Sequence, residues 1–147
     1  FIYYVIFIFV PVAGPTFYYK AVGLHNITAG IFPNIHDYFN HHQECLPSPG
    51  YTDGIFYHLV EDAKAAGERP TAAFPSSHVG VSTVCMLLLW HDRNYKLLAI
   101  LAPFYLLLCC ATVYIQAHYL IDAIAGFITA VILFAILLRI SRKMITE

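Results

Sequence analysis

Two histidines stand out because of the residues that surround them. His118 lies four positions before Asp122 in the segment AHYLIDAIAG, so on a helix the two would share one face and the carboxylate could reach an imidazole nitrogen. A carboxylate that holds one ring nitrogen as N–H leaves a lone pair on the other, which makes that other nitrogen a nucleophile or a base. The plainer alternative is a helix-capping aspartate beside an interfacial histidine.

The segment AAFPSSHVG predicts a site for an anion. Pro75 fixes the chain direction, and Ser76 can cap a helix that begins at about Ser77. The first free N–H groups of that helix, near Ser77, His78 and Val79, would point the same way, where the helix dipole also favours an anion. His78 stands in this first turn, in a position to donate a proton to a bound phosphate ester. An ordinary helix cap with an incidental histidine is the alternative.

The composition indicates that these residues are positioned by a membrane protein. The chain has 147 residues, of which 59% are apolar and 12% charged, against about 45–50% and about 25% in ordinary soluble domains. The net charge of −1 gives no field that would select nucleic acid. Any phosphate must therefore be bound by local groups.

The apolar runs predict an all-α bundle of membrane helices. Between Lys96 and Arg139 the only Asp, Glu, Lys or Arg is Asp122, and a bilayer core needs about 20 apolar residues per helix. This stretch therefore predicts two spans, at about residues 97–115 and 119–140. A third apolar run covers residues 79–90 and is too short to reach the membrane surface at its start.

We expect residues 1–147 to form one membrane domain that lacks its earlier spans, because the chain opens inside the apolar run FIYYVIFIFV. Residues 14–73 are expected to form an interfacial loop with an amphipathic piece near residues 52–66, and residues 76–140 a catalytic core of three membrane helices. Lysine and arginine concentrate in the connection HDRNYK and after Leu138, which places those ends in the cytoplasm and both histidine segments at the opposite face.

Taken together, FPSSHVG and AHYLIDAIAG resemble the second and third signature motifs of the type 2 phosphatidic acid phosphatase superfamily, which comprises integral-membrane lipid phosphatases and phosphotransferases. Pro75, Ser76, Ser77 and His78 stand where that family has Pro-Ser-Gly-His, with Ser77 in the glycine position. The resemblance implies a six-helix membrane fold, of which this chain would be the later part.

The resemblance also implies roles for the matching residues. His118 would be the nucleophile that forms a phosphohistidine, and Asp122, which ends the His-x-x-x-Asp pattern, would orient it. His78 would protonate the leaving alcohol. Ser76 and the adjacent backbone N–H groups, including those of Ser77 and Val79, would hold the phosphate.

The chain departs from the family pattern in its cations. Where the family's third motif has Ser-Arg, this sequence has Ala111 and Thr112. Of the family's first motif, it has only a shortened version in KAAGERP, residues 64–70. A phosphate in a partly dehydrated pocket requires a cation. We expect Arg69 to supply it, with Lys64 as a weaker candidate that is otherwise a solvated loop charge.

These observations predict a phosphatase that hydrolyses a lipid phosphate monoester or diphosphate without a metal or another cofactor. The partners implied are the lipid phosphate substrate and the bilayer. We expect a bacterial inner membrane with the site facing the periplasm; the oligomeric state stays open. Because the inositol phosphorylceramide synthase branch also lacks the third-motif arginine, transfer of the phospho-headgroup to a ceramide or an inositol-type alcohol is one alternative. A non-enzymatic transporter or scaffold with a His/Asp proton site is the other.

A polar cluster in the loop weighs less. Asp37, His41, His42, Glu44 and Cys45 are zinc-ligand types, but their spacing fits no standard zinc pattern. We interpret this cluster as polar surface.

Overall fold

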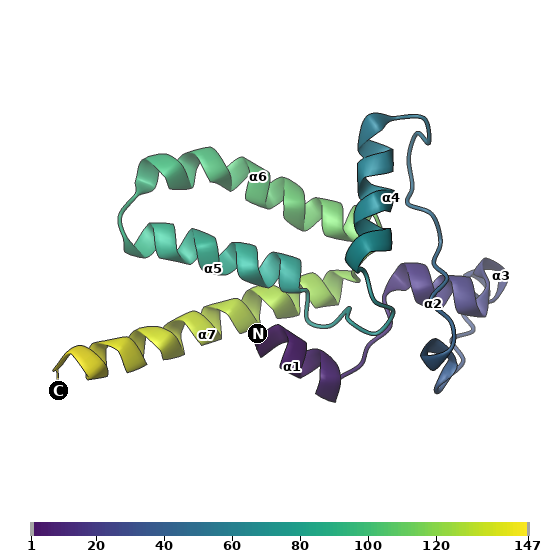
Figure 1. Ribbon diagram of the computed structural model, residues 1–147, viewed down its shortest axis with the longest axis horizontal. Helices are drawn as coiled ribbons and strands as arrows, with labels where there is room; N and C mark the ends of the chain where they lie inside the picture. The colour runs from purple at the N-terminus through teal and green to yellow at the C-terminus, as the bar shows by residue number, and fades with distance from the viewer. Residues whose placement is uncertain (1, 147) are drawn as a thin grey trace.

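Three long helices form the body of the molecule in the computed structural model, which describes residues 2–146 and side chains as far as Met144 (Figure 1). Helix α5 (Ser77–His91) and helix α6 (Tyr95–Tyr114) run antiparallel, and helix α7 (Leu120–Thr146) packs along α5. The predicted apolar runs therefore correspond to three helices whose ends differ from the prediction by a few residues.

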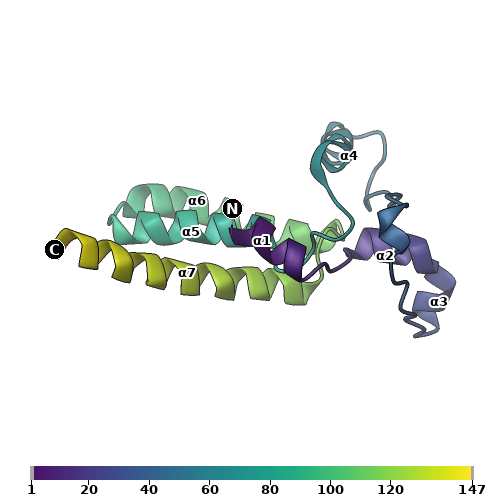
Figure 2. The ribbon, with the colours of Figure 1, turned by 60° about the horizontal axis from the view of Figure 1, so that its bottom comes forward.

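The remaining elements gather at one end of this bundle. Helix α1 (Ile2–Phe9) lies against the bundle, whereas α2 (Pro15–Val22), α3 (Leu24–Thr28), the 3₁₀ turn η1 (Tyr38–Asn40) and α4 (Ile55–Gly67) lie beyond it (Figures 1 and 2). Residues 2–146 contain no strand, only a parallel bridge between Val12 and Ala72. The all-helical prediction is confirmed. The segment predicted as a loop contains three α-helices, and the amphipathic piece expected near residues 52–66 is α4.

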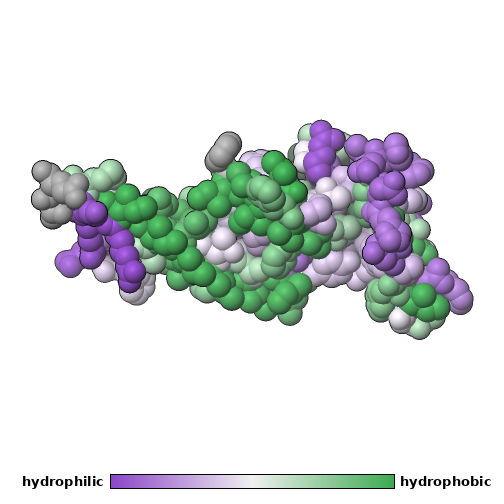
Figure 3. Space-filling model, turned by 90° about the horizontal axis from the view of Figure 1, so that it is seen from below, coloured by the Kyte–Doolittle hydropathy of each residue, from purple (hydrophilic) through white to green (hydrophobic). Residues whose placement is uncertain are grey.

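Polar side chains are buried in this bundle, and apolar side chains face outward. The buried apolar residues are mostly small, and polar residues are buried as well, in the bundle (Ser76, Thr83, Thr112, His118 and Asp122) and beyond it (Thr16 and Ser48). Figure 3 shows the outer surface of the bundle as largely hydrophobic, with hydrophilic surface gathered at the α2–α4 end and near the C-terminus. In water, such an exposed apolar surface would be unfavourable.

Two of the helices are long and apolar enough to cross a bilayer. They are Tyr95–Tyr114 and Leu120–Met144, with mean hydropathies of 2.2 and 2.6. Only 6% and 22% of the 18-residue apolar stretches in these helices is buried inside the protein. Helix α5 is apolar but has 15 residues, about 22 Å of helix, against a hydrocarbon core of about 30 Å. Two candidate spans and one shorter helix thus lie side by side.

Small residues allow α7 to approach its neighbours closely. Ala123, Gly126 and Ala130 are buried on one face of α7, and a Cβ atom on Gly126 would overlap the carbonyl oxygen of Ser76. The hydroxyl of Tyr3 donates to the Gly126 carbonyl at 3.1 Å and occupies the space that a side chain on Gly80 would need. Small residues at helix contacts are typical of membrane bundles, and here they bring α1, α5 and α7 together.

The two ends of the bundle carry different groups. The α5–α6 connection and the C-terminus lie at one end, and the first residues of α5 and α7 lie at the other, beside α2 and α4 (Figure 1). Both histidine segments therefore share an end, opposite the connection and tail that hold most of the lysines and arginines.

Candidate functional site

Two imidazoles from distant parts of the chain are in contact at this end. Nδ1 of His78, in the first turn of α5, lies 3.4 Å from Nε2 of His118, which stands two residues before the start of α7. The ring centroids are 5.6 Å apart. His118 is only 4% exposed, whereas His78 is exposed. A substrate can therefore reach the pair from the side of His78.

The protonation of His118 follows from its partner. Its Nδ1 lies 2.8 Å from the carbonyl oxygen of Ala73, and because a carbonyl can only accept, Nδ1 carries the hydrogen. The lone pair of the neutral ring is then on Nε2, the atom that faces His78. The pKa of His118 is lowered to about 4, mainly by burial; the hydrogen bond to Ala73 raises this pKa and nearby His78 lowers it. At neutral pH His118 is uncharged.

Asp122 is placed differently from the sequence expectation. Its Oδ2 lies 4.0 Å from Nδ1 of His118, too far for a hydrogen bond, and accepts from the backbone N–H of Tyr119 at 2.8 Å. The reason is that α7 begins at Leu120, so His118 precedes the helix and the four-residue spacing does not bring the two groups together. Asp122 instead caps the start of α7 from its third position, and the Ala73 carbonyl holds the imidazole.

The start of α5 has the predicted cap. Ser76 is fully buried, and its Oγ accepts from the Val79 backbone N–H at 3.4 Å; the predicted capping role is therefore confirmed. This bond occupies the Val79 N–H group that we expected to bind phosphate. The N–H groups of Ser77 and His78 have no acceptor within the helix, because they belong to its first turn.

Main-chain hydrogen bonds join the segments around His118. The N–H of Ala73 donates to the Val12 carbonyl at 3.1 Å, and the N–H of His118 donates to the Thr112 carbonyl at 3.1 Å. Gln116, between Thr112 and His118 in the sequence, has a φ of 60°, a left-handed conformation that residues other than glycine seldom adopt. It turns the chain back after α6. The backbone N–H of Ser76 donates to the Asp122 carbonyl at 2.9 Å, which ties α5 to α7.

The structure does not bring the predicted cations to the histidine pair. The Lys64 ammonium lies 3.1 Å from Glu61 Oε1 and also donates to Leu46 O and Ser48 Oγ, so its charge is already paired. Arg69 is exposed and donates to Gln43 Oε1 at 3.4 Å. It is, however, only four residues from Ala73 in sequence.

Thr112 stands at the position where the family that the sequence resembles has the arginine of its third motif. It is buried, and its hydroxyl donates to the Cys109 carbonyl at 2.9 Å. Its own carbonyl receives the His118 N–H, so this position supports the nucleophile candidate through the backbone.

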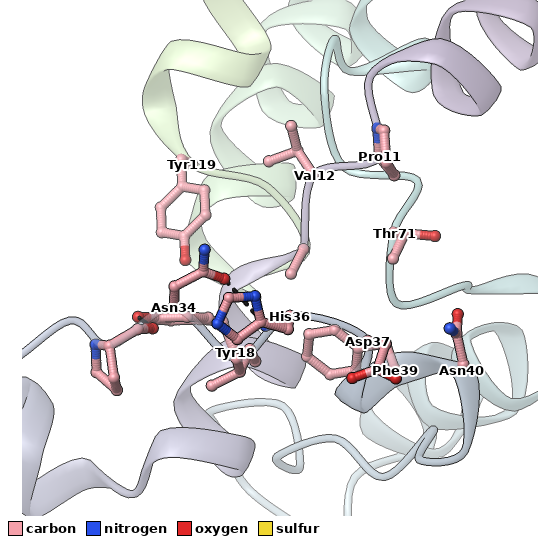
Figure 4. A pocket seen from close by; sticks show the side chains of 13 residues that line it. Pro11, Val12, Tyr18, Asn34, His36, Asp37, Phe39, Asn40, Thr71 and Tyr119 are labelled. Carbon is pink, nitrogen blue, oxygen red and sulfur yellow. Dashed lines mark hydrogen bonds between the residues drawn. The ribbon is translucent and has the colours of Figure 1, made fainter.

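One cavity includes His78 in its wall, and another includes Tyr119, the residue after His118. The first, which we call the helix-side cavity, has about 310 Å³ and is lined by His78 and by residues of α1, α5 and α6: Tyr3, Tyr4, Ser77, Val81, Ser82 and Leu108. The second, the loop-side cavity, has about 660 Å³ and includes Tyr119 in its wall (Figure 4). Among residues 2–146, no group of His, Cys, Asp and Glu side chains is arranged to hold a metal ion.

Sequence reasoning missed Ala73, Gln116 and Tyr3. Ala73 and Gln116 act through the main chain, so their side chains give no signal of their role. Tyr3 acts through its hydroxyl, which lies beside Gly80 and Gly126, residues that are far from it in the sequence.

Comparison with known proteins identifies one family. A family model described as the PAP2 superfamily matches residues 1–136. No curated protein and no solved structure matches the chain.

Proposed function

Because the chain belongs to the PAP2 superfamily, whose members are phosphatases, we propose that it hydrolyses a lipid phosphate monoester or diphosphate through a phosphohistidine at Nε2 of His118. The observation that carries this proposal is the pairing of the two imidazoles. His118 is buried and neutral with its lone pair on Nε2, and His78 faces that atom from an exposed position 3.4 Å away.

The proposed reaction has two displacements. Nε2 of His118 forms a bond to phosphorus as the bond from phosphorus to the lipid oxygen breaks, and protonated His78 gives its proton to that oxygen. Water then attacks phosphorus and the bond to Nε2 breaks. The proton lost by water returns to His78, so both histidines end in their starting states.

Substrate entry requires His78 to move. A phosphate cannot lie between two nitrogens that are 3.4 Å apart, so the exposed His78 side chain must rotate outward when the substrate binds. We assign phosphate binding to the N–H groups of Ser77 and His78 and to the Ser76 hydroxyl. This hydroxyl would exchange its hydrogen bond with the Val79 N–H for one with the phosphate.

Charge compensation is assigned to Arg69. Arg69 lies four residues before Ala73, and extended chain of this length spans at most about 14 Å. The Arg69 side chain is exposed, so its guanidinium is free to reorient. Lys64 is proposed to stabilise the loop through Glu61. Asp122 is a positioning residue, since it caps α7 directly after His118.

We place the apolar part of the leaving lipid alcohol in the helix-side cavity. His78 and Ser77 line it, and the exposed apolar residues Val81 and Tyr4 form its outer wall. This wall belongs to the surface that would face the hydrocarbon, which allows a lipid to enter from the bilayer. The site would lie on the periplasmic side of a bacterial inner membrane, opposite the lysine- and arginine-rich end.

Transfer to an alcohol is the second candidate, favoured by Thr112 in place of the family's arginine. It shares the first displacement, and an acceptor alcohol replaces water in the second. Purified protein incubated with labelled phospholipid, with and without inositol or ceramide, separates the two by product.

The test of the proposed mechanism is covalent trapping. Protein in detergent is mixed with ³²P-labelled phosphatidic acid and quenched, and we expect acid-labile, base-stable label on the wild type but none on His118→Asn. Vanadate should inhibit phosphate release. Equal labelling of the wild type and His118→Asn would exclude His118 as the nucleophile.

A further inference from the structure

Helix α4 carries strongly exposed apolar side chains on one side. Ile55, Phe56 and Leu59 are 77%, 84% and 58% exposed, and at 3.6 residues per turn they fall within a face of about 100°. Ala63 and Ala66, which are also exposed, continue this face toward the end of the helix. We call these five residues the apolar face of α4. None of them lines either cavity beside the histidines.

Polar bonds fix the opposite side of α4 to the chain that precedes the helix. The Lys64 ammonium lies 3.1 Å from Glu61 Oε1 and donates to the Leu46 carbonyl at 3.0 Å. Glu61 Oε1 also accepts from the Ser48 backbone N–H at 3.0 Å. Ile55 and Lys64 are nine residues apart, about two and a half turns of helix, so they point to opposite sides. These bonds therefore determine which side of α4 stays exposed.

The position of α4 matches the surface of a bilayer. In Figures 1 and 2 the helix stands across the direction in which α5, α6 and α7 run, at the level where α6 ends. Helix α6 is long and apolar enough to cross a bilayer, and only 6% of its apolar stretch is buried inside the protein. Helix α4 is therefore parallel to the plane of a bilayer that α6 crosses, and it lies at the edge of that bilayer.

The apolar face of α4 is directed toward this bilayer. The chain that leads into α4 includes Leu46 and Ser48 and lies on the side of the helix away from the bundle (Figures 1 and 2). Lys64 and Glu61 face that chain. The apolar face on the other side of the helix therefore looks back toward the level of the membrane helices, where it extends their exposed apolar surface.

We propose that α4 docks on the bilayer at the histidine end of the bundle, with its apolar face among the first carbons of the acyl chains. A helix in the interface is held by its buried apolar area and by attraction between basic residues and anionic lipids. Lys64 is the only lysine or arginine in α4, and its charge is paired with Glu61 on the opposite side. Apolar burial therefore provides the binding, and anionic lipid is not required.

The test is fluorescence quenching in nanodiscs of phosphatidylcholine that carries bromine on its acyl chains. Trp90, the only tryptophan of the chain, is replaced by phenylalanine. A single tryptophan is then introduced by Leu59→Trp in the apolar face or, as the matched control, by Ala65→Trp. Ala65 is also exposed but lies about 120° from Leu59 around the helix. We expect the bromolipid to remove most of the emission of Leu59→Trp, and water-soluble acrylamide to quench Ala65→Trp instead.

Phe56→Trp gives a second position in the apolar face, with a side chain exposed enough to be replaced without disturbing the fold. Quenching of Leu59→Trp and Phe56→Trp by acrylamide but not by bromolipid would place this face in water and overturn the proposal. Protection from both quenchers would reveal a protein or a second copy on the face and overturn it as well. Equal quenching of Ala65→Trp by bromolipid would exclude the assigned orientation. No readout uses phosphate release, so the result is independent of the proposed function.

Discussion

The buried neutral state of His118 makes the stability of the protein depend on pH. In the folded chain the pKa of His118 is about 4, against about 6.5 for an imidazole in an unfolded chain. Between these two values, the unfolded chain binds a proton that the folded chain does not. The free energy of unfolding therefore falls as the pH drops from 6.5 to 4, by about 3 kcal/mol in total. Above pH 6.5 this contribution is fully present.

The variant that isolates this effect is His118→Asn. Its amide N–H can still donate to the Ala73 carbonyl, but it has no group that titrates in this range. Unfolding in detergent is followed by circular dichroism at several pH values from 8 to 4, and the difference between wild type and variant is plotted against pH. Titrating groups that do not interact with His118 cancel in this difference.

We expect the difference in the free energy of unfolding to be constant above about pH 6.5. By pH 4 the wild type should have lost about 3 kcal/mol relative to the variant. The control is the exposed His25→Asn, which should keep the profile of the wild type. A difference between wild type and His118→Asn that stays flat to pH 4 would refute the argument that His118 is held neutral by burial.

Three other predictions concern activity and packing. His118→Asn and His78→Asn should each lower phosphate release by about 10³-fold or more while the helical circular dichroism is kept; near wild-type turnover in either folded variant contradicts the assigned roles. Gly126→Ala should destabilise the protein by about 1–3 kcal/mol, because its Cβ meets the backbone of Ser76, whereas Gly67→Ala, with open space around it, should be neutral or slightly stabilising; thermal unfolding in detergent measures both, and equal melting temperatures would show that the close contact is absent. Arg69→Gln should lower kcat/KM for a lipid phosphate by about tenfold or more, with partial recovery in Arg69→Lys; unchanged kinetics would exclude Arg69 as the phosphate cation.

The helices could be predicted because their signals are local. The apolar runs give α5, α6 and α7, and Ser76 before Ser77 gives the start of α5. Each depends on residues that are neighbours in the sequence. The helices inside residues 14–73 were less clear, because short amphipathic segments with Pro, Gly and aromatic residues match several structures equally well.

The approach of the two histidines was inferred from their shared membrane end, but their contacts could not be. The partner of His118 Nδ1 is the main-chain oxygen of Ala73, 45 positions away, and every residue except the last offers such an oxygen. Asp122 was the only acidic side chain nearby in sequence, so it was the natural candidate. The start of α7 at Leu120, two residues later than the helical pairing requires, directs its carboxylate to Tyr119 instead.

The framework around His118 consists largely of peptide groups: Val12 to Ala73, Ala73 to the imidazole, Thr112 to the His118 N–H, and Asp122 to Ser76. Peptide groups are the same whatever side chains they bear. Related chains could therefore exchange the residues that line the two cavities, and so change the molecule they accept, while the reactive nitrogen keeps its position. Selection for a new substrate would then act on the walls of the site and leave its centre in place.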